Sequence, residues 1–360
     1  MKKAYLVLED GHVFEGLSFG AEVPGIGELV FSTGMCGYIE TLTDPSYYGQ
    51  IVLQTFPLIG NYGMIEDDFE GKCRLRGYVV REYCDTPSNF RAQYGIDKFL
   101  RDNGIPGIYG VDTRQITKIL RESGVMNAYI TTELPVLDGE LKKYAVTRAV
   151  ESVTVAQPEI YEACGEQKHE VVLVDYGAKK NIIRELCKRG CRVTVVPASY
   201  SAEKILALSP DGIMLSNGPG DPAENVFCIE QLKKLLGRLP IFGICLGHQL
   251  MALANGGETY KLKYGHRGVN QPVRETDGTR TYITSQNHGY AVASDSVRCG
   301  KVSFVNANDK TCEGMDYPEI NAFSVQFHPE ACSGPKDTSF LFDRFISMMG
   351  GNGNAAEQKY

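Results

Sequence analysis

The sequence contains no apolar run long enough to cross a membrane. Its longest apolar stretch, residues 239–254, is interrupted by Gly243, Gly247, His248 and Gln249, and it falls short of the ~20 apolar residues that a spanning helix requires. The apolar stretch near the N-terminus is too short for a secretory signal peptide. We therefore expect no membrane contact, and we interpret residues 239–254 as a buried strand followed by a helix.

An excess of positive charge is also missing. The 360 residues include 37 Lys and Arg against 44 Asp and Glu, which gives a formal net charge of −7. Because nucleic acids and anionic membranes bind basic surfaces, we expect neither as a partner. The hydrophobic share of 43% and the charged share of 22% are typical of a globular protein. The length predicts two domains of roughly 100–200 residues each.

Paired cysteine motifs are absent as well. The eleven cysteines are odd in number and form no CxxC pair, which argues against the disulfide framework of a secreted protein and for a reduced, cytoplasmic chain. Cys187 and Cys191 have no histidine partner at ligand spacing, so we expect no metal site. Cys36 and Cys332 lie near the motifs described below, and we interpret them as small space-filling side chains.

The first part of the chain has the pattern of short strands separated by turns. Strands are predicted at residues 4–8, 12–14, 27–31, 50–54 and 77–81. A helix is predicted to begin after Asp112, a good N-cap, and to end at Gly124. We therefore predict a β-rich α+β domain over residues 1–150, which is followed by a polar linker at residues 151–168.

After this linker, continuous apolar strands alternate with helices. The strands are predicted at residues 170–174, 191–196, 212–215 and 240–244. This alternation is typical of an α/β domain with a parallel sheet covered on both faces, in which ligands bind at the carboxyl ends of the strands. We assign residues 169–350 to this domain and residues 351–360 to a flexible tail.

The strongest chemical signal follows the strand at residues 240–244. Gly243 and Gly247 lie two residues before and two residues after Cys245, which is the spacing of a nucleophile elbow with Cys in place of Ser. Small flanking residues permit a tight turn that directs a helix N-terminus at the thiol. The alternative is a buried core cysteine, but the glycine spacing favours a nucleophile. A helix dipole of roughly 0.3–2 kcal/mol lowers a thiol pKa by at most ~1.5 units, so a basic partner is still needed.

His328 is the best candidate for that partner. It follows an apolar strand, and Glu330 comes two residues later, beyond Pro329. Residues i and i+2 of an extended segment point the same way, so the Glu330 carboxylate can orient the His328 ring. The pattern predicts a Cys–His–Glu triad of nucleophile, base and orienting group. The alternative is a surface turn whose His and Glu face solvent.

Two further segments carry polar residues in suggestive places. Residues 215–222 place two glycines around Pro219 directly after a strand, which suits exposed backbone N–H groups for an oxyanion or a carboxylate. Residues 285–290 are predicted to form a polar loop, for which a plain surface turn is the alternative. No phosphate-binding loop is recognisable in the sequence, so ATP chemistry is expected on another polypeptide.

These segments together resemble the triad-type, class I glutamine amidotransferases. The resemblance rests on residues 243–249, G-I-C-L-G-H-Q, residues 216–222, S-N-G-P-G-D-P, and residues 327–330, F-H-P-E. The first part of the chain resembles the small chains of carbamoyl phosphate synthetases. The segments that carry this second resemblance are residues 31–40, 42–47, 57–61, 88–91 and 175–181.

The resemblance implies a role for individual residues. Cys245 would be the nucleophile, His328 the acid–base group and Glu330 its partner, while the N–H groups of Leu246 and Gly218 would form an oxyanion hole. The residues that would hold glutamine are Ser46, Lys179, Gly220, Gln249, Asn287, Gly289 and Tyr290. The family often has Phe at the position of Tyr290. Because Ser46 lies in the first domain, the glutamine site is expected at the domain boundary.

The implied activity is hydrolysis of L-glutamine to glutamate through a Cys245 thioester, with ammonia passed to a large subunit. That subunit would make carbamoyl phosphate from bicarbonate and ATP with Mg, so no cofactor is expected on this chain. The assembly would be a heterodimer or larger, serving arginine or pyrimidine biosynthesis. Alternatives are the glutaminase part of another synthetase, a cysteine hydrolase of γ-glutamyl peptides, or a binding subunit with an inactive site.

Overall fold

The computed structural model describes residues 2–134, 140–331 and 333–350. The predicted flexible tail at residues 351–360 and Cys332 lie outside the described residues. Within these ranges no helix combines the length and the apolar character that crossing a membrane demands.

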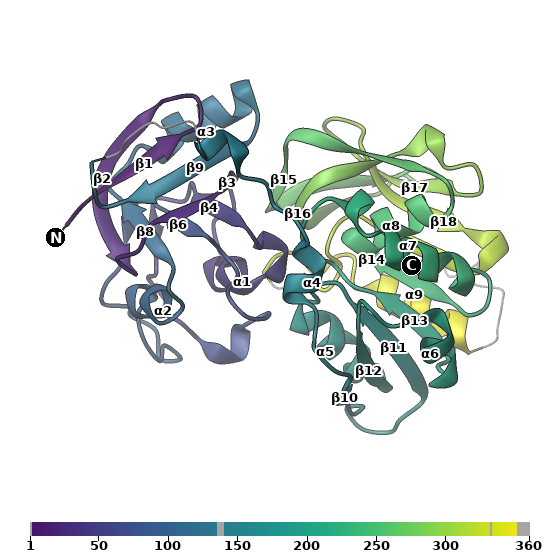
Figure 1. Ribbon diagram of the computed structural model, residues 1–360. Helices are drawn as coiled ribbons and strands as arrows, with labels where there is room; N and C mark the ends of the chain where they lie inside the picture. The colour runs from purple at the N-terminus through teal and green to yellow at the C-terminus, as the bar shows by residue number, and fades with distance from the viewer. Residues whose placement is uncertain (1, 135–139, 332, 351–360) are drawn as a thin grey trace. The chain divides into compact units, whose positions relative to one another are not determined.

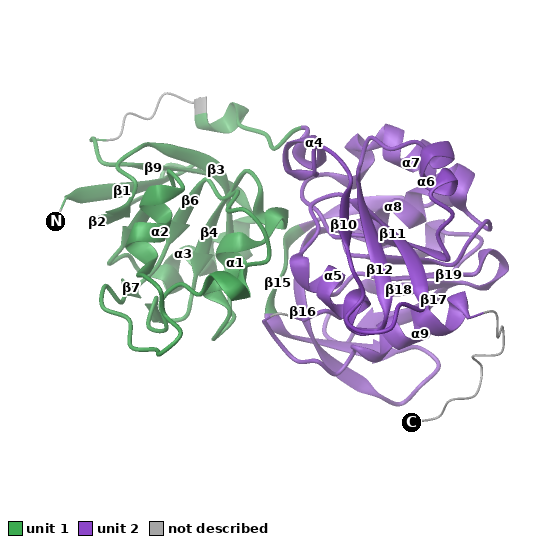
Figure 2. Ribbon diagram, turned by 90° about the horizontal axis from the view of Figure 1, so that it is seen from below, with its two compact units in different colours: residues 1–147, 263–268 green, residues 148–262, 269–360 purple. Residues whose placement is uncertain are grey.

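The chain divides into two compact units, which are coloured separately in Figure 2. Unit 1 contains residues 1–147 and residues 263–268, and unit 2 contains residues 148–262 and 269–360. Residues 263–268 return to unit 1 and are held there by a backbone hydrogen bond. The N–H of Val125 donates to the carbonyl of Lys263 over 2.9 Å.

Unit 1 is built on a closed β-barrel with the strand order β1-β2-β8-β6-β4-β3-β9 (Figure 1). Its strands are β1 (Lys3–Leu8), β2 (Val13–Gly20), β3 (Gly25–Ser32), β4 (Gln50–Gln54), β6 (Gly77–Val79), β8 (Pro106–Tyr109) and β9 (Met126–Thr131), with β5 (Leu58–Ile59) and β7 (Glu82–Tyr83) as a separate pair. The helices are α1 (Tyr38–Thr43), α2 (Ile96–Asp102) and α3 (Thr113–Ser123), with 3-10 turns η1 (Pro45–Tyr47), η2 (Glu66–Asp68) and η3 (Glu140–Lys143). The prediction of a β-rich first part is confirmed.

Helix α3 forms where the sequence predicted it. The Asp112 side chain accepts hydrogen bonds from the N–H groups of Arg114 and Gln115 at 3.1 and 3.0 Å, a cap of about 1 kcal/mol. Ile116 and Leu120 are fully buried with the barrel strands, and each such side chain stabilises the fold by roughly 1.5–3 kcal/mol. The local sequence and the barrel core therefore favour the same structure.

Unit 2 is built on one large sheet with the order β10-β12-β11-β13-β14-β19-β18-β17-β15-β16. Its strands are β10 (Glu159–Tyr161), β11 (His169–Asp175), β12 (Cys191–Pro197), β13 (Gly212–Leu215), β14 (Ile241–Ile244), β15 (Glu258–Glu275, of which residues 263–268 belong to unit 1), β16 (Thr281–Ala293), β17 (Lys301–Asn306), β18 (Cys312–Tyr317) and β19 (Ala322–Val325). The helices are α4 (Ala149–Val153), α5 (Lys180–Lys188), α6 (Ala202–Ala207), α7 (Val226–Leu235), α8 (Leu246–Ala254) and α9 (Phe340–Met349), with 3-10 turns η4 (Pro222–Glu224), η5 (Ser294–Ser296) and η6 (Pro318–Ile320).

The central part of this sheet is parallel and covered on both faces, as the apolar strands predicted. Strands β12, β11, β13, β14 and β19 pair in parallel. Val172 and Val174 of β11 belong to a core shared with α6, α7 and α8, whereas Val171 and Leu173 belong to a second core shared with α5 and α9. Alternation along each strand thus supplies two apolar layers.

Two features of unit 2 differ from the sequence-based expectation. The sheet continues beyond β19 through the antiparallel strands β18, β17 and β15 to β16, so it is mixed rather than wholly parallel. The predicted linker at residues 151–168 contains the end of α4 and the strand β10, which pairs antiparallel with β12. Strand β10 is only three residues long and lacks an apolar run, so the sequence pattern does not predict it. It is recognised only from its pairing with β12 in the structure.

Candidate active site

Four neighbouring parallel strands, β11, β13, β14 and β19, end at one edge of the unit 2 sheet. The predicted site segments follow these ends. Lys179 comes after β11, residues 216–222 after β13, Cys245 after β14, and His328 and Glu330 after β19. Because the carboxyl ends of parallel strands meet at the same edge, residues separated by up to 151 positions in sequence are brought together there.

Cys245 occupies a strained turn between β14 and α8. Its backbone has φ 53° and ψ −102°, a conformation that costs a non-glycine residue of order 1–3 kcal/mol. The flanking glycines are required by close packing, because a Cβ on Gly247 would lie 2.5 Å from the Leu215 carbonyl oxygen. A Cβ on Gly243 would lie 2.9 Å from the carbonyl group of Gly247. The predicted elbow geometry is therefore present.

The Cys245 side chain is buried and lies at the N-terminus of α8. Its thiol lies 3.7 Å from the backbone carbonyl oxygen of Asn287 on β16. Leu246 is the first residue of α8, so its N–H is one of those that a helix leaves without an internal acceptor. The thiol thus faces the positive end of a helix dipole, which favours the thiolate.

Gly218 lies against the elbow. A Cβ on Gly218 would lie 2.8 Å from the Leu246 side chain and 2.3 Å from the Tyr176 carbonyl oxygen, so only glycine fits. The carbonyl of Ser216, two residues earlier, accepts the N–H of Gly247 at 3.0 Å. The loop after β13 is thereby fixed next to the first turn of α8, where the resemblance predicted two oxyanion donors.

His328 and Glu330 form a buried, hydrogen-bonded pair. His328 Nδ1 lies 2.7 Å from Glu330 Oε1, and both side chains are completely buried. Burial raises the pKa of Glu330, but the charges of His328 and Lys179 and the hydrogen bond from His328 outweigh it and lower that pKa to about 2. His328 Nε2 is buried without a hydrogen bond among the described residues. The hydrogen bond at Nδ1 therefore fixes the ring, and Nε2 is available to accept or donate a proton.

Lys179 lies beside this pair. Its Nζ is 3.5 Å from Glu330 Oε1, and its side chain is only 6% exposed, so the ammonium supports the carboxylate of the predicted triad. The backbone N–H of Lys179 donates to Asn217 Oδ1 at 3.0 Å, and Asn217 in turn donates to the Gly177 carbonyl at 2.9 Å. Asn181 donates to the Glu330 carbonyl.

Sequence reasoning missed Asn217 and Asn181 as structural parts of the site. Both lie inside the segments that carry the family resemblance, at residues 216–222 and 175–181. Their position in these segments was the available signal, but their bonding partners are distant in sequence. Asn181 and Glu330, for example, are 149 positions apart.

Residues 285–290 do not form a loop, so the prediction of a polar loop is wrong, and they do not form the alternative surface turn either. They lie within β16, and residues 284–288 are buried. The Ser285 carbonyl accepts the N–H of His328 at 2.9 Å, which ties β16 to the predicted base. The polar side chains misled the interpretation because their hydrogen-bond partners come from other strands. Asn287, Gly289 and Tyr290 are consequently held on a regular strand.

The remaining predicted ligand-contacting residues have defined local settings. Gln249 on α8 donates from Nε2 to the Tyr290 carbonyl at 2.8 Å. Gly220 has φ 89°, which favours glycine. Ser46 lies in unit 1, where it is buried on η1 and donates its backbone N–H to Asp44 Oδ1 at 2.8 Å.

Three other buried cysteines contrast with a reactive thiol. Burial raises the pKa of Cys187 and of Cys228 to about 11, and that of Cys312 to about 12. Thiols in this state are protonated at neutral pH and react slowly. They are small apolar groups of the two cores, in agreement with their sequence setting.

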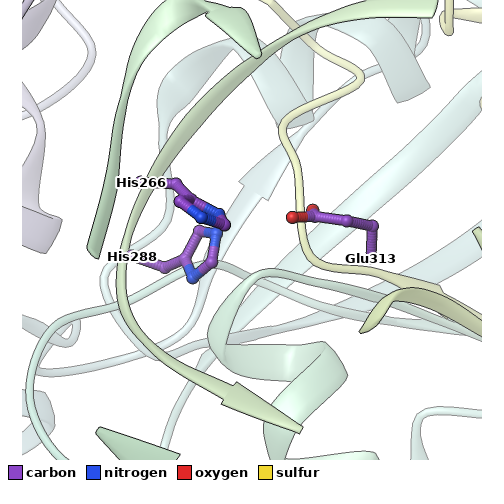
Figure 3. Close-up of side chains that lie close together, drawn as sticks. All are labelled: His266, His288 and Glu313. Atoms are coloured by element: carbon purple, nitrogen blue, oxygen red, sulfur yellow. The ribbon is translucent and has the colours of Figure 1, made fainter. Parts of the chain in front are cut away.

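A second polar cluster, drawn in Figure 3, is formed by side chains of β15, β16 and β18. His266, His288 and Glu313 each bring a ligand atom within 4.8 Å of the others, and all three are buried. Protein groups already meet both ring nitrogens of His288. Nδ1 lies 2.8 Å from the Tyr290 carbonyl oxygen, and Nε2 lies 3.2 Å from Gln286 Oε1. The expectation that the chain binds no metal stays a prediction. Among the described residues, this cluster is the place at which metal binding would be tested.

Comparison with known families agrees with both halves of the resemblance. Residues 172–348 match the model of the class-I glutamine amidotransferases. Residues 6–130 match the model of the CPSase domain of the carbamoyl-phosphate synthase small chain. The two matches together cover most of the chain.

Similar proteins span the whole length. The chain is 51% identical over 356 residues to the carbamoyl phosphate synthase small chain of Listeria monocytogenes serotype 4b, covering 98% of both chains. It is 50% identical over 346 residues to that of Clostridium perfringens, covering 96% of this chain and 99% of the other. It is 50% identical over 359 residues to that of Fusobacterium nucleatum, covering 98% and 99%.

Proposed function

This chain belongs to the family of carbamoyl-phosphate synthase small chains with a class-I glutamine amidotransferase domain, and from that premise we propose that it releases ammonia from L-glutamine through a thioester on Cys245. One observation carries the proposal. A strained cysteine at a helix N-terminus follows the strand next to the one that leads to a buried His328–Glu330 pair. That set of groups suits acyl transfer through a cysteine nucleophile.

In the proposed mechanism, His328 Nε2 takes the proton of the Cys245 thiol. The thiolate attacks the side-chain carboxamide carbon of glutamine, and the resulting oxyanion accepts hydrogen bonds from the N–H groups of Leu246 and Gly218. His328 then protonates the departing nitrogen, which leaves as ammonia when the carbon–nitrogen bond breaks. Water, deprotonated by His328, attacks the thioester, the carbon–sulfur bond breaks, glutamate is released and the Cys245 thiol is regenerated.

Glu330 supports each step in which His328 gains a proton. With a pKa of about 2 it stays ionised at neutral pH, so it stabilises the imidazolium and fixes Nδ1 as its donor. Lys179 is also proposed to keep Glu330 ionised, because its Nζ lies 3.5 Å from Glu330 Oε1. The residues proposed to hold the substrate, on the strength of the family resemblance, are Ser46, Lys179, Gly220, Gln249, Asn287, Gly289 and Tyr290.

The proposed partner is the large chain of a carbamoyl-phosphate synthase, because the relatives are named as small chains of that enzyme. Bicarbonate, ATP and Mg would be used on that chain, and no cofactor is proposed for this one. Free ammonia would diffuse into water, so delivery within a heterodimer or larger complex is proposed. Eleven cysteines without paired motifs support a reduced cytoplasmic setting.

The test is glutamate release by the purified chain, alone and with a carbamoyl-phosphate-forming large chain. We expect vigorous release only in the complex. Cys245→Ser should abolish glutamine-dependent carbamoyl phosphate synthesis and leave ammonia-dependent synthesis intact. Cys228→Ser, a buried thiol on α7 with a raised pKa, is the matched control and should retain both activities.

Other outcomes would identify the alternatives. Equal, vigorous release without the large chain would indicate a free-standing hydrolase. No release in either state would indicate an inactive site that serves only binding. Loss of ammonia-dependent synthesis in Cys245→Ser would overturn the proposed division of labour between the chains.

A further inference from the structure

Gln326 is a buried polar residue that the mechanism above does not use. It follows β19 directly and precedes His328 by two residues, and its side chain is fully buried. Its backbone N–H donates to the Glu313 carbonyl at 2.9 Å, which fixes the main chain at this point. A buried glutamine is unusual, because both halves of its amide need partners.

Only one half of the Gln326 amide has a partner among the described residues. Its Oε1 accepts a hydrogen bond from Gln249 Nε2 at 3.0 Å, whereas its own Nε2 is buried and unpaired. An unpaired buried donor carries a free-energy cost that an apolar side chain of similar size would avoid. The side chain therefore needs a justification other than stability.

The hydrogen bonds of Gln249 fix the orientation of both amides. Gln249 Nε2 lies 2.8 Å from the Tyr290 backbone carbonyl, which can only accept, so the NH₂ group of Gln249 must face it. The second N–H of that group faces Gln326, so Gln326 must present its oxygen. Rotation of either amide by 180° would place two acceptors or two donors against each other.

This arrangement uses both donors of Gln249 inside the protein. The atom that remains for a ligand is Gln249 Oε1, a hydrogen-bond acceptor, and the amide plane that carries it is held at two points. If the hydrogen bond to the Tyr290 carbonyl were its only one, the Gln249 amide could rotate about that hydrogen bond. Gln326 supplies the second point, and its unpaired Nε2 is the consequence of presenting Oε1.

We propose that Gln326 is a positioning residue for substrate binding, which locks the Gln249 amide with Oε1 directed at the bound glutamine. The proposal rests on the proposed function, since it assigns Gln326 to the same glutamine site. It requires that Gln326 act through Gln249 and not on the Cys245 chemistry.

The test uses the complete enzyme with its large chain and compares Gln326→Met with Gln326→Glu. Methionine keeps the length but cannot accept from Gln249, so KM for glutamine should rise about 3- to 10-fold with kcat nearly unchanged. Glutamate keeps an oxygen in the accepting position and should restore most of the KM. The Gln249→Met, Gln326→Met double variant should bind glutamine no more weakly than Gln249→Met alone, because the two residues act in series.

Ser324→Ala is the matched control. Ser324 lies two residues before Gln326, and its Oγ is 2.8 Å from Nδ1 of His248, so it makes the neighbouring link between α8 and the β19 segment. Its loss should lower the unfolding temperature without changing KM. If Ser324→Ala raises KM as much as Gln326→Met does, the role of Gln326 is general packing and the proposal fails.

Two further results would overturn the proposal. One is an unchanged KM in Gln326→Met, and the other is additive KM effects in the double variant. Failure of the proposed function is a separate outcome, because it would appear as absent glutamine hydrolysis in the unmodified complex. Ammonia-dependent synthesis should stay unchanged in every variant and reports that the complex is folded.

Discussion

The two halves of the unit 2 sheet contribute different groups to the candidate site. The parallel half ends in tight turns that carry Cys245, His328 and Glu330, the groups proposed to react. The antiparallel half contributes residues within a regular strand, Asn287 and Tyr290 among them. Turns after strands can hold a strained backbone, whereas a strand holds alternating side chains at fixed spacing. The difference suggests that chemistry and substrate recognition are separated between the halves.

This separation predicts different kinetic signatures. Variants in the turns of the parallel half should lower kcat, and variants in β16 should raise KM, since uniform binding energy affects KM alone. Gln249 and Gln326 are exceptions, because they lie beside the parallel strands and are linked through the Gln249 side chain to the Tyr290 carbonyl on β16. Gly220, in the turn after β13, is a third exception, since it is proposed to hold the substrate. The predictions below test the separation, from the largest expected effect to the smallest.

His328→Asn should have the largest effect. Without the imidazole, neither the thiol nor the leaving nitrogen exchanges a proton, so kcat for glutamine should fall on the order of 10⁴-fold with little change in KM. Steady-state glutamate release by the complex measures it. His12→Asn, at an exposed histidine of unit 1, is the control. A raised KM with kcat retained would contradict the separation.

Gly218→Ala should lower kcat by about 10²–10³-fold, the typical cost of one oxyanion donor. The new Cβ would lie 2.3 Å from the Tyr176 carbonyl oxygen, so the loop must move and carry its N–H away. Gly256→Ala is the control, because Gly256 follows α8 with open space around it and φ 78°. It should lower stability slightly and leave kcat intact. Equal loss of kcat in both variants would indicate helix distortion and not a lost donor.

The parallel half was also the part that the sequence predicted well. Its strands are continuous apolar runs, and the elbow signal around Cys245 is local, within two residues on either side. The His328–Glu330 pair is local for the same reason, since i and i+2 share a side of an extended segment. Interactions that depend on nearby residues can be inferred without the fold.

The antiparallel half was predicted poorly because its polar residues find partners across strands. Gln286 on β16 donates to Glu313 on β18 at 3.0 Å, so a buried strand has the composition of a loop. The link of Lys179 to Glu330 and that of Gln249 to Gln326 join distant segments in the same way. The proposed roles of the residues around the substrate came from family resemblance, and they stay predictions.

Asn287→Ala should raise KM for glutamine by about 10- to 100-fold, the typical cost of losing a hydrogen bond to a charged ligand group, because the family resemblance implies that Asn287 holds glutamine. The backbone carbonyl that contacts the Cys245 thiol is retained, so kcat should change little. Glutamine titration of the complex gives both constants. Asn308→Ala, at an exposed asparagine after β17, should leave both unchanged. A lower kcat at unchanged KM would assign Asn287 to the chemistry and break the separation.

His248 lies in the parallel half but should affect neither constant. Burial lowers its pKa to about 3, so it stays neutral in the folded protein at every working pH. The unfolded chain binds the proton near pH 6.5, so the contribution of His248 to stability is complete above pH 6.5 and is lost progressively as pH falls towards 3. Between pH 7 and pH 5 that loss is about 2 kcal/mol. Glu330 titrates in a lower window, between its ordinary pKa of 4.5 and about 2, and does not contribute there.

Urea unfolding of the wild type and His248→Asn at pH 7 and pH 5 measures this difference. The variant should lose about 2 kcal/mol less than the wild type over that interval, whatever its stability at pH 7. An identical loss would show that His248 is protonated in the fold and that its 2.8 Å contact with Ser324 is made by an imidazolium. If His248→Asn instead changed kcat and left the pH dependence of stability unchanged, His248 would take part in the reaction. The reacting groups of the parallel half would then include a residue of α8 in addition to the turn at Cys245.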